Sequence, residues 1–287
     1  MADGEAGFDL DGLLGAMRPR LHRYCARMLG SAFDGEDVVQ EALARAAVAY
    51  GPEVREPERW LMRIAHNAAL DALRRRRRRA ERQGDADLDA IADPGAAADA
   101  RIAVEAGLAA FLTLPPLQRS TVILGDVLGH PLGETSEILG VTDASAKAAL
   151  HRGRAALRRH AGDPTPPPAF SAAERIRLRA YADRFNARDF DALRALLAED
   201  VRLDLAGRPH LVGPAVGVYF TRYSENLGGW SARPCLADGR LAVAISDPAL
   251  AADYVVLVEW RGGCIAVIHD YRYAPYVLEA VRLEIID

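Results

Sequence analysis

The sequence has almost no lysine, few cysteines and no long apolar run. Lys147 is the only lysine, so arginine supplies nearly all of the 36 basic residues. Cys25, Cys235 and Cys264 are far apart and odd in number, which argues against disulfides and against a zinc site. No apolar stretch reaches the roughly 18 residues of a membrane span, and the N-terminus lacks a secretory leader. We therefore expect a soluble, cytoplasmic protein with no metal, no cofactor and no membrane partner.

Charge is distributed unevenly along the chain. The net charge is only −4, yet six consecutive arginines, Arg74–Arg79, precede a stretch from Asp85 to Asp99 that holds aspartates and no basic residue. Nucleic acids respond to such local basic surfaces and not to the net charge of a protein. The sequence thus indicates a cationic helix end followed by an anionic tether.

Periodicity and composition divide the 287 residues into three blocks. Apolar residues recur at helical spacing in the first two blocks, whereas the third changes to alternating, β-rich runs after two helices. The predicted fold class is multidomain, with an all-α N-terminal half of two helical domains and a C-terminal α+β domain. The predicted parts are a helical block at residues 1–80, an acidic linker at 81–101, a helical block at 102–160, a proline-rich linker at 161–170 and the α+β domain at 171–287.

The second block contains a candidate helix-turn-helix. Gly140 breaks a short helix around residues 132–139, and Thr142 can cap a final helix from Asp143 to about Arg159. At 100° per residue the apolar side chains of that helix share one face and the basic side chains share an adjacent face. Such a helix can enter the major groove of DNA, although a solvated basic face on an ordinary bundle is the alternative. The residues predicted to approach bases or phosphates are Ser145, Lys147, Ala148, His151, Arg152 and Arg154.

Four phrases of the two helical blocks resemble σ70-type RNA polymerase initiation factors of the extracytoplasmic-function group. The first two resemble region 2 of these factors, and the last two resemble region 4. In order, the phrases are DVVQEALARA (residues 37–46), WLMRIAHNAALDALRRRRRR (60–79), LPPLQRSTVIL (114–124) and ILGVTDASAKAALHRGRAAL (138–157).

The resemblance implies two partners, core RNA polymerase and promoter DNA. Region 2 is expected to bind the clamp of the largest polymerase subunit, and region 4 is expected to bind the flap and the minus-35 duplex. The acidic tether is expected to lie in the RNA exit path, where it would mimic RNA. The implied polymerase-binding residues are Asp37, Gln40, Glu41 and Arg45. The implied minus-10 residues are Trp60, Arg63, Asn67, Arg74 and Arg75, with Trp60 open between core packing and a stacking platform.

The helix-turn-helix departs from the pattern of this family at two positions. Members of the family usually have an aliphatic residue where Thr135 stands and an arginine where Ala149 stands. We therefore expect the motif to be more polar inside and less basic outside than in other members.

The third block resembles the SnoaL-like proteins of the nuclear-transport-factor-2-like superfamily, which are cone-shaped α+β barrels around a pocket. The phrases RLRAYADRFNARDFDALRALLAEDVRLDLAGR (residues 177–208) and HDYRYAPYVLEAVRL (269–283) carry the resemblance. Alternation along the last strand places His269 and Asp270 on opposite faces of the sheet. Retained catalysis, a pocket that senses a small-molecule ligand, and an interdomain role all stay open. The candidate pocket residues are Asp204, Tyr219, Tyr223, Trp230 and His269.

The sequence therefore predicts a non-enzymatic alternative sigma factor whose C-terminal domain regulates its activity. Two other interpretations remain. One is a helix-turn-helix regulator that binds duplex DNA without polymerase. The other is a SnoaL-like isomerase, cyclase or ligand sensor fused to a DNA-binding module.

Overall fold

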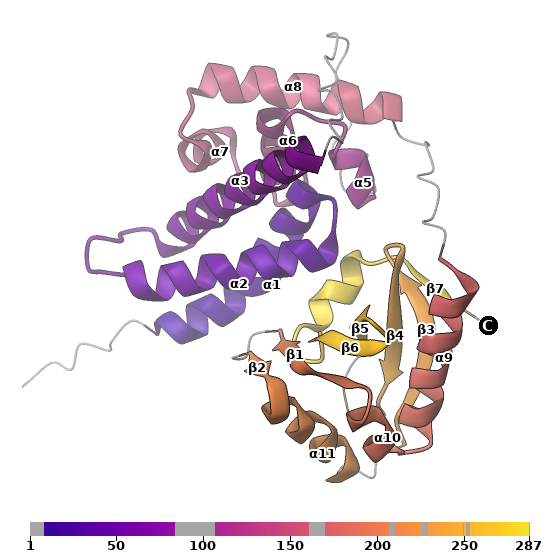
Figure 1. The fold of residues 1–287 in the computed structure, drawn as a ribbon. Helices are drawn as coiled ribbons and strands as arrows, with labels where there is room; N and C mark the ends of the chain where they lie inside the picture. Colours follow the sequence, from indigo (N-terminus) through magenta and orange to yellow (C-terminus); the bar gives the residue numbers. More distant parts are fainter. Residues whose placement is uncertain are drawn as a thin grey trace, which may run out of the picture. The chain divides into compact units, whose positions relative to one another are not determined.

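The structure is a computed structural model that describes most of the chain (Figure 1). Most of the two predicted linkers, 81–101 and 161–170, lies outside the described residues. The first helical block continues past its predicted end at residue 80, because its last helix runs to Gln83. The described ranges are residues 9–83, 107–160, 170–206, 210–225, 229–248, 250 and 253–286.

Capping residues set where the first helices begin. Asp9 caps one helix by accepting the Gly12 N–H at 2.8 Å, and Ser31 caps the next by accepting the Asp34 N–H at 3.2 Å. Proline opens the third helix, where its missing N–H costs nothing. The helices of this block are α1 (Leu10–Leu29), α2 (Ala32–Ala49) and α3 (Pro57–Gln83).

The predicted helix-turn-helix is confirmed as a local structure. Gly140 adopts a left-handed φ of 66° at the turn, and the Thr142 hydroxyl caps the final helix by accepting the Ser145 N–H at 3.2 Å. The helix just before the motif is α-helical only in its first half and ends in a π turn. The elements of this block are α5 (Leu108–Phe111), α6 (Pro116–Val122), the π turn η1 (Ile123–Val127), α7 (Leu132–Leu139) and α8 (Asp143–His160).

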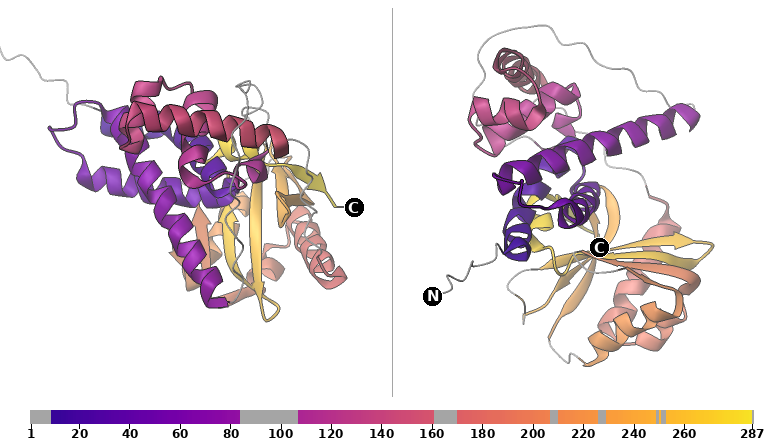
Figure 2. Two further views of the ribbon diagram at one scale, coloured as in Figure 1. Left: turned by 90° about the horizontal axis from the view of Figure 1, so that it is seen from above. Right: turned by 90° about the vertical axis from the view of Figure 1, so that its left-hand side faces the viewer.

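One hydrophobic core joins the two helical blocks. The chain divides into two units, Met1–Thr165 and Pro166–Asp287, and the first unit contains both blocks. Tyr24 of α1 is fully buried in the same apolar cluster as Leu114 and Ile123 of the second block. α1 packs against α5, α6 and η1, while α3, the long helix visible in both views of Figure 2, packs against α7.

The second unit is built on a mixed seven-stranded sheet in the order β2-β1-β6-β5-β4-β3-β7. β1 and β6 are parallel, and the remaining pairs are antiparallel. Two helices precede the sheet, α9 (Ala172–Asn186) and α10 (Phe190–Arg194), and α11 (Gly217–Glu225) follows the short 3-10 helix η2 (Gly213–Val216). The strands are β1 (Leu197–Leu205), β2 (Leu211–Val212), β3 (Ser231–Ala237), β4 (Arg240–Ser246), β5 (Tyr254–Arg261), β6 (Cys264–Asp270) and β7 (Leu283–Ile285), with the 3-10 helix η3 (Pro275–Ala280) before the last.

Two adjacent glycines make the tight hairpin between β5 and β6. Gly262 and Gly263 have φ of 60° and 91°, which glycine adopts without strain, and Arg261 pairs directly with Cys264 across the turn. Among the described residues, no helix is both long and apolar enough to cross a bilayer.

Candidate polymerase and nucleic-acid interface

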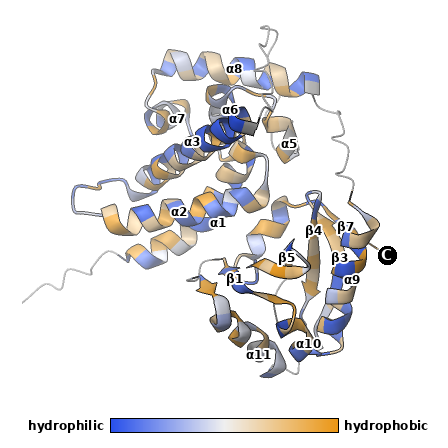
Figure 3. Cartoon of the chain, in the orientation of Figure 1, coloured by the Kyte–Doolittle hydropathy of each residue, from blue (hydrophilic) through white to orange (hydrophobic). Residues whose placement is uncertain are grey.

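Three of the residues expected near minus-10 DNA form one exposed stripe on α3. Arg63, Asn67 and Arg74 are exposed, and at 100° per residue they lie within about 40° of one another around the helix. Arg63 also donates to the Glu137 carbonyl oxygen of α7 at 2.8 Å. The arginine-rich end of α3, blue in Figure 3, continues the charge. Cationic groups, which suit phosphates, and an amide, which suits a base edge, therefore share one surface.

Trp60 and Arg75 have different surroundings from that stripe. Trp60 is half-buried at the start of α3, where its ring meets Tyr50 edge-on with centroids 5.9 Å apart, and it packs against the core. Arg75 lies 100° around the helix from Arg74 and donates to Glu41 of α2 at 2.9 Å. In this structure Trp60 belongs to the core, and Arg75 ties α3 to α2.

The residues expected to bind polymerase lie on α2. Asp37 and Arg45 are exposed, while Gln40 and Glu41 are half-buried. Glu41 accepts hydrogen bonds from both Arg75 and Arg45. The hydrogen bond from Arg75, aided by the charge of Arg45, lowers the pKa of the Glu41 carboxyl below its ordinary value. A cationic partner would thus meet an ionised carboxylate.

α8 presents the expected minus-35 residues with unequal exposure. Lys147 and His151, which are one turn apart, are exposed, whereas Ser145, Ala148 and Arg152 are half-buried. The apolar face predicted for this helix points inward, as its spacing required. The freely exposed basic surface of α8 is therefore smaller than the helical pattern suggests.

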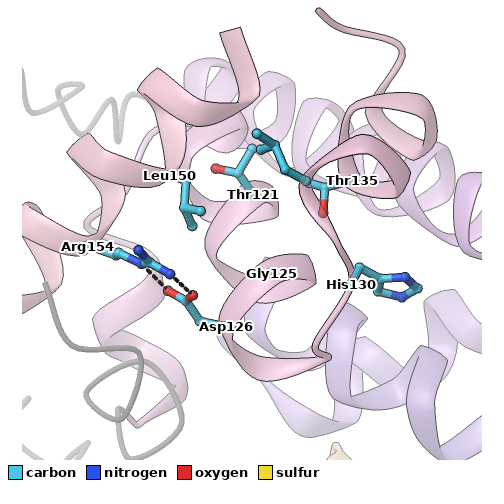
Figure 4. A pocket seen from close by; sticks show the side chains of 8 residues that line it. Thr121, Gly125, Asp126, His130, Thr135, Leu150 and Arg154 are labelled. Carbon is cyan, nitrogen blue, oxygen red and sulfur yellow. Dashed lines mark hydrogen bonds and ion pairs between the residues drawn. The ribbon is translucent and has the colours of Figure 1, made fainter. Parts of the chain in front are cut away.

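Arg154 is paired with a buried carboxylate, although 31% of its own side chain is exposed. Its Nε donates to Asp126 Oδ2 at 2.8 Å and a terminal nitrogen donates to the other oxygen, which makes a bidentate pair (Figure 4). The Asp126 side chain is only 2% exposed. The structure therefore assigns Arg154 to this pair, in place of the free basic face that the helical pattern predicted.

Thr135 makes the inside of the helix-turn-helix polar, as expected. The residue is 2% exposed, and its hydroxyl has no hydrogen-bond partner among the described residues. It borders a hollow of about 120 Å³ that Thr121, Gly125 and Leu150 also line (Figure 4). An aliphatic side chain would fill part of this space.

Small residues let α8 approach α6 closely. A Cβ on Gly153 would lie 2.6 Å from Val122 Cγ2 and 3.0 Å from the Gln118 carbonyl oxygen, so only glycine fits without a shift. Ala149 is fully buried. The expectation that Ala149 makes the outer face less basic is therefore wrong, because this position faces the core.

Two buried polar contacts inside the first block were not predicted. Arg18 Nε donates to Glu36 at 3.1 Å, and the Glu36 side chain is fully buried. The Tyr24 hydroxyl lies 2.7 Å from His66 Nδ1, and burial lowers the pKa of His66 to about 4. Each contact joins two different helices, at sequence separations of 18 and 42 residues, so no spacing within one helix signals it.

The interior of the second unit holds a carboxyl group surrounded by tyrosines. Tyr219 and Tyr223 donate to Asp270 Oδ2 at 2.9 and 3.1 Å, and Tyr223 also contacts Tyr254 at 2.8 Å. Asp270 is 1% exposed, and burial raises the pKa of its carboxyl. The hydroxyl of Tyr181, which is equally buried, has no partner among the described residues. The candidate pocket residues that we predicted from the sequence did not include Asp270, Tyr181 or Tyr254.

Trp230 lies in the same interior, but two other predicted pocket residues do not. Trp230 is buried beneath the guanidinium of Arg188, 3.2 Å from its ring centroid. Asp204 and His269 are neighbours in the parallel register of β1 and β6, with His269 Nδ1 3.2 Å from Asp204 Oδ2. His269 is partly buried, with 16% of its side chain exposed, beside fully buried Asp270, in agreement with their opposite faces on β6. The candidate pocket residues therefore fall into two separate groups.

No group of three or more His, Cys, Asp or Glu side chains in the described part of the chain is arranged to hold a metal ion. The chemistry of the first unit is that of a nucleic-acid and protein surface, with arginines, an amide and ionised carboxylates on exposed helix faces.

Known proteins match both helical blocks. Residues 13–79 match Sigma-70 region 2, and residues 108–157 match Sigma-70, region 4. The sigma factor SigG of Mycobacterium tuberculosis is 34% identical over 61% of this chain and 55% of its own length, so the chain spans about half of SigG. The crystal structure of M. tuberculosis SigJ covers 91% of this chain and 95% of SigJ at 22% identity, with a TM-score of 0.38.

A shorter relative is matched over most of its length. The ECF RNA polymerase sigma factor SigW of Bacillus subtilis is 31% identical over 51% of this chain and 85% of SigW. The match to region 2 contains the exposed surfaces of α2 and α3, and the match to region 4 contains the exposed surface of α8. The chain therefore belongs to the ECF RNA polymerase sigma factor family.

Proposed function

We propose that the whole chain is an alternative sigma factor that binds core RNA polymerase, recognises a promoter, assists strand separation and has no catalytic activity. The exposed stripe of Arg63, Asn67 and Arg74 carries the proposal, because it combines phosphate-binding cations with an amide suited to a base edge. Lys147 and His151 on α8 supply a second basic surface on the same unit. Two such surfaces suit a protein that contacts two promoter elements.

In this proposal α2 binds the clamp of the largest polymerase subunit, and region 4 binds the flap. Asp37, Gln40, Glu41 and Arg45 make the clamp contact, since carboxylates and an amide within one or two helical turns offer acceptors to arginines of a partner helix. Glu41 is already shared between two arginines. Clamp binding would therefore exchange one ion pair for another, at little net electrostatic cost.

At the minus-35 duplex, Ser145, Lys147 and Ala148 approach base edges at the start of α8, while His151 and Arg152 contact phosphates. Ser145, Lys147 and Ala148 lie in the first two turns of the recognition helix, and His151 and Arg152 lie in the third, which supports this division. Arg154 contributes indirectly, because its pair with Asp126 fixes α8 against the π turn.

We assign the second unit to regulation and to the SnoaL-like fold, which is supported by its order of two helices followed by a mixed sheet. A general base needs a carboxylate oxygen directed at a substrate. Asp270 Oδ2 accepts from two tyrosines, and Oδ1 accepts the Arg272 N–H at 2.8 Å. Both oxygens are engaged within the protein, which favours a structural carboxyl over a catalytic one.

Co-purification with bacterial core RNA polymerase, followed by run-off transcription from a genomic promoter library, tests the proposal. We expect a stoichiometric complex that Glu41→Lys weakens and that a charge-matched control on the exposed Glu279, Glu279→Lys, leaves unchanged. Asn67→Ala is expected to lower open-complex formation while polymerase binding persists. A chain that forms no complex with core polymerase refutes the proposal.

A further inference from the structure

A partly open hollow lies inside the helix-turn-helix part of region 4, where three walls meet. The end of α6 and the π turn η1 form one wall, α7 forms the second and the recognition helix α8 forms the third (Figure 4). We call this space the region 4 hollow, and its volume is about 120 Å³. Since an apolar cavity of about 150 Å³ binds benzene, a hollow of this size can hold roughly five non-hydrogen atoms.

The Thr135 hydroxyl faces the region 4 hollow and has no hydrogen-bond partner among the described residues (Figure 4). Thr135 is only 2% exposed, so bulk solvent does not replace the missing bond. Burial of a donor without an acceptor is unfavourable. A ligand that brings an acceptor to this hydroxyl therefore forms a hydrogen bond that the protein itself does not make.

The charged side chains that line the region 4 hollow are already paired within the protein. Arg154 and Asp126 form their bidentate pair. His130 has its Nδ1 3.0 Å from Glu134 Oε2 and its Nε2 3.0 Å from a terminal nitrogen of Arg20. An anion or a cation in the hollow would have to break one of these contacts to gain a counter-charge. The hollow therefore favours a neutral ligand.

The remaining lining groups suit a short apolar body with one oxygen atom. Leu132 of α7 and Leu150 of α8 supply aliphatic walls, and Gly125 adds no side chain. Thr121 already donates its hydroxyl proton to carbonyl oxygens of its own helix, so it offers only acceptor lone pairs. The free donor in the hollow is thus the hydroxyl of Thr135, and the ligand atom that meets it must be an acceptor.

We infer that the region 4 hollow is a binding site for a small neutral molecule with one oxygen acceptor on a short apolar body, such as a short-chain alcohol or ketone. The ligand oxygen accepts the hydrogen bond of Thr135, and its carbon atoms lie against Leu132 and Leu150. Because these two leucines belong to α7 and α8, an occupant stabilises the packing of the helix-turn-helix. The site requires neither polymerase nor DNA, so it stands apart from the proposed function.

Methyl NMR spectroscopy of the full chain tests the inference with four probes of similar size. 1-Butanol and 2-butanone are neutral and have one oxygen, whereas butylamine and butyrate carry opposite charges at neutral pH. We expect saturable shifts of the Leu132 and Leu150 methyl signals with the two neutral probes, and none with the charged probes. The methyl signals of Leu178, in the core of the second unit, are the internal control and should not move.

Removal of the donor provides the second readout. Thr135→Val keeps the shape of the side chain but loses the hydroxyl, so the affinity for 1-butanol should fall about 2- to 12-fold, which corresponds to one hydrogen bond. Thr113→Val is the matched control, because the Thr113 hydroxyl lies outside the hollow and donates to the Ala110 carbonyl oxygen at 2.7 Å. The control should bind 1-butanol as tightly as wild type.

Partial filling of the hollow provides the third readout. In Gly125→Ala the added Cβ would lie 3.7 Å from Leu150 Cδ1, which is an ordinary contact, so the variant narrows the space without a clash. Both neutral probes should bind this variant more weakly. Gly133→Ala adds the same methyl group at an exposed position of α7, where no atom lies within 4 Å, and should bind them like wild type.

Three results would overturn the inference. Absence of a saturable shift at Leu132 and Leu150 with both neutral probes means that water alone fills the hollow. Equal affinity of wild type and Thr135→Val for 1-butanol removes the hydroxyl from the site. Charged probes that bind as tightly as 1-butanol contradict the assignment of a neutral ligand. Each of these results leaves the sigma-factor function standing, because polymerase and DNA are absent from the measurement.

Discussion

The unpaired hydroxyl of Thr135 gives a sharp prediction about stability. Thr135→Val keeps the shape of the side chain and removes a polar group that is buried without a partner in the described structure. Such a group costs about 1–3 kcal/mol. We therefore expect the free energy of unfolding of the first unit to rise by at least about 1 kcal/mol. In calorimetry, the transition of that unit should move up by about 2 °C or more.

Thr121 supplies a matched control in the same hollow. It is also fully buried, but its hydroxyl donates to the carbonyl oxygens of Leu117 at 3.0 Å and Gln118 at 2.9 Å. Thr121→Val should therefore lower stability by about 0.5–1.5 kcal/mol, the opposite sign. If Thr135→Val also destabilises, the Thr135 hydroxyl is satisfied by water in the hollow and the reasoning fails.

Three further changes test buried features of the first unit, and a fourth, at the exposed Gly133, is a control. Arg18→Met leaves the carboxylate of fully buried Glu36 without its cation and should cost about 3–5 kcal/mol in urea unfolding. Burial lowers the pKa of His66 from 6.5 to about 4, so the folded form resists protonation. The free energy of unfolding should therefore fall by up to about 3 kcal/mol as the pH drops between these two values. The variant His66→Asn cannot titrate and should flatten this part of the curve of stability against pH. Gly153→Ala should lower the free energy of unfolding by about 1–3 kcal/mol, because the added Cβ would meet α6. In Gly133→Ala on α7 the added Cβ would meet no atom within 4 Å, so this variant should be slightly more stable than wild type. Calorimetry measures both effects.

Local chemistry explains which elements the sequence predicts well. Thr142 and Gly140 place the helix-turn-helix because capping and left-handed turns depend on neighbouring residues alone. The tight turn at Gly262 and Gly263 is likewise set by two neighbouring glycines with positive φ. β3 was not predicted, since Pro234 lies within it and proline removes a ladder donor. Its pairing with β4 is a tertiary contact that overrides this local signal.

Helical spacing predicts which side chains share a face but not what they meet. Arg63, Asn67 and Arg74 emerge together on α3 as the pattern requires. Arg154 was expected on the free basic face, yet its partner Asp126 lies 28 residues away in sequence, where spacing has no information. Alternation likewise separated His269 from Asp270 correctly, while the tyrosines around Asp270 come from other elements.

Exposure divides the arginines of the first unit into two kinds with different roles. Arg18, Arg119 and Arg154 hold deeply buried acceptors, and breaking such contacts strands a polar group at a cost of several kcal/mol. Arg59 and Arg75 pair with carboxylates that solvent reaches, where each pair is worth about 0.2–1 kcal/mol. Phosphates or the carboxylates of another protein can replace the carboxylate partners of the second kind at almost no net cost. A nearly lysine-free surface can therefore stay paired in the free chain and still release its charges to a partner.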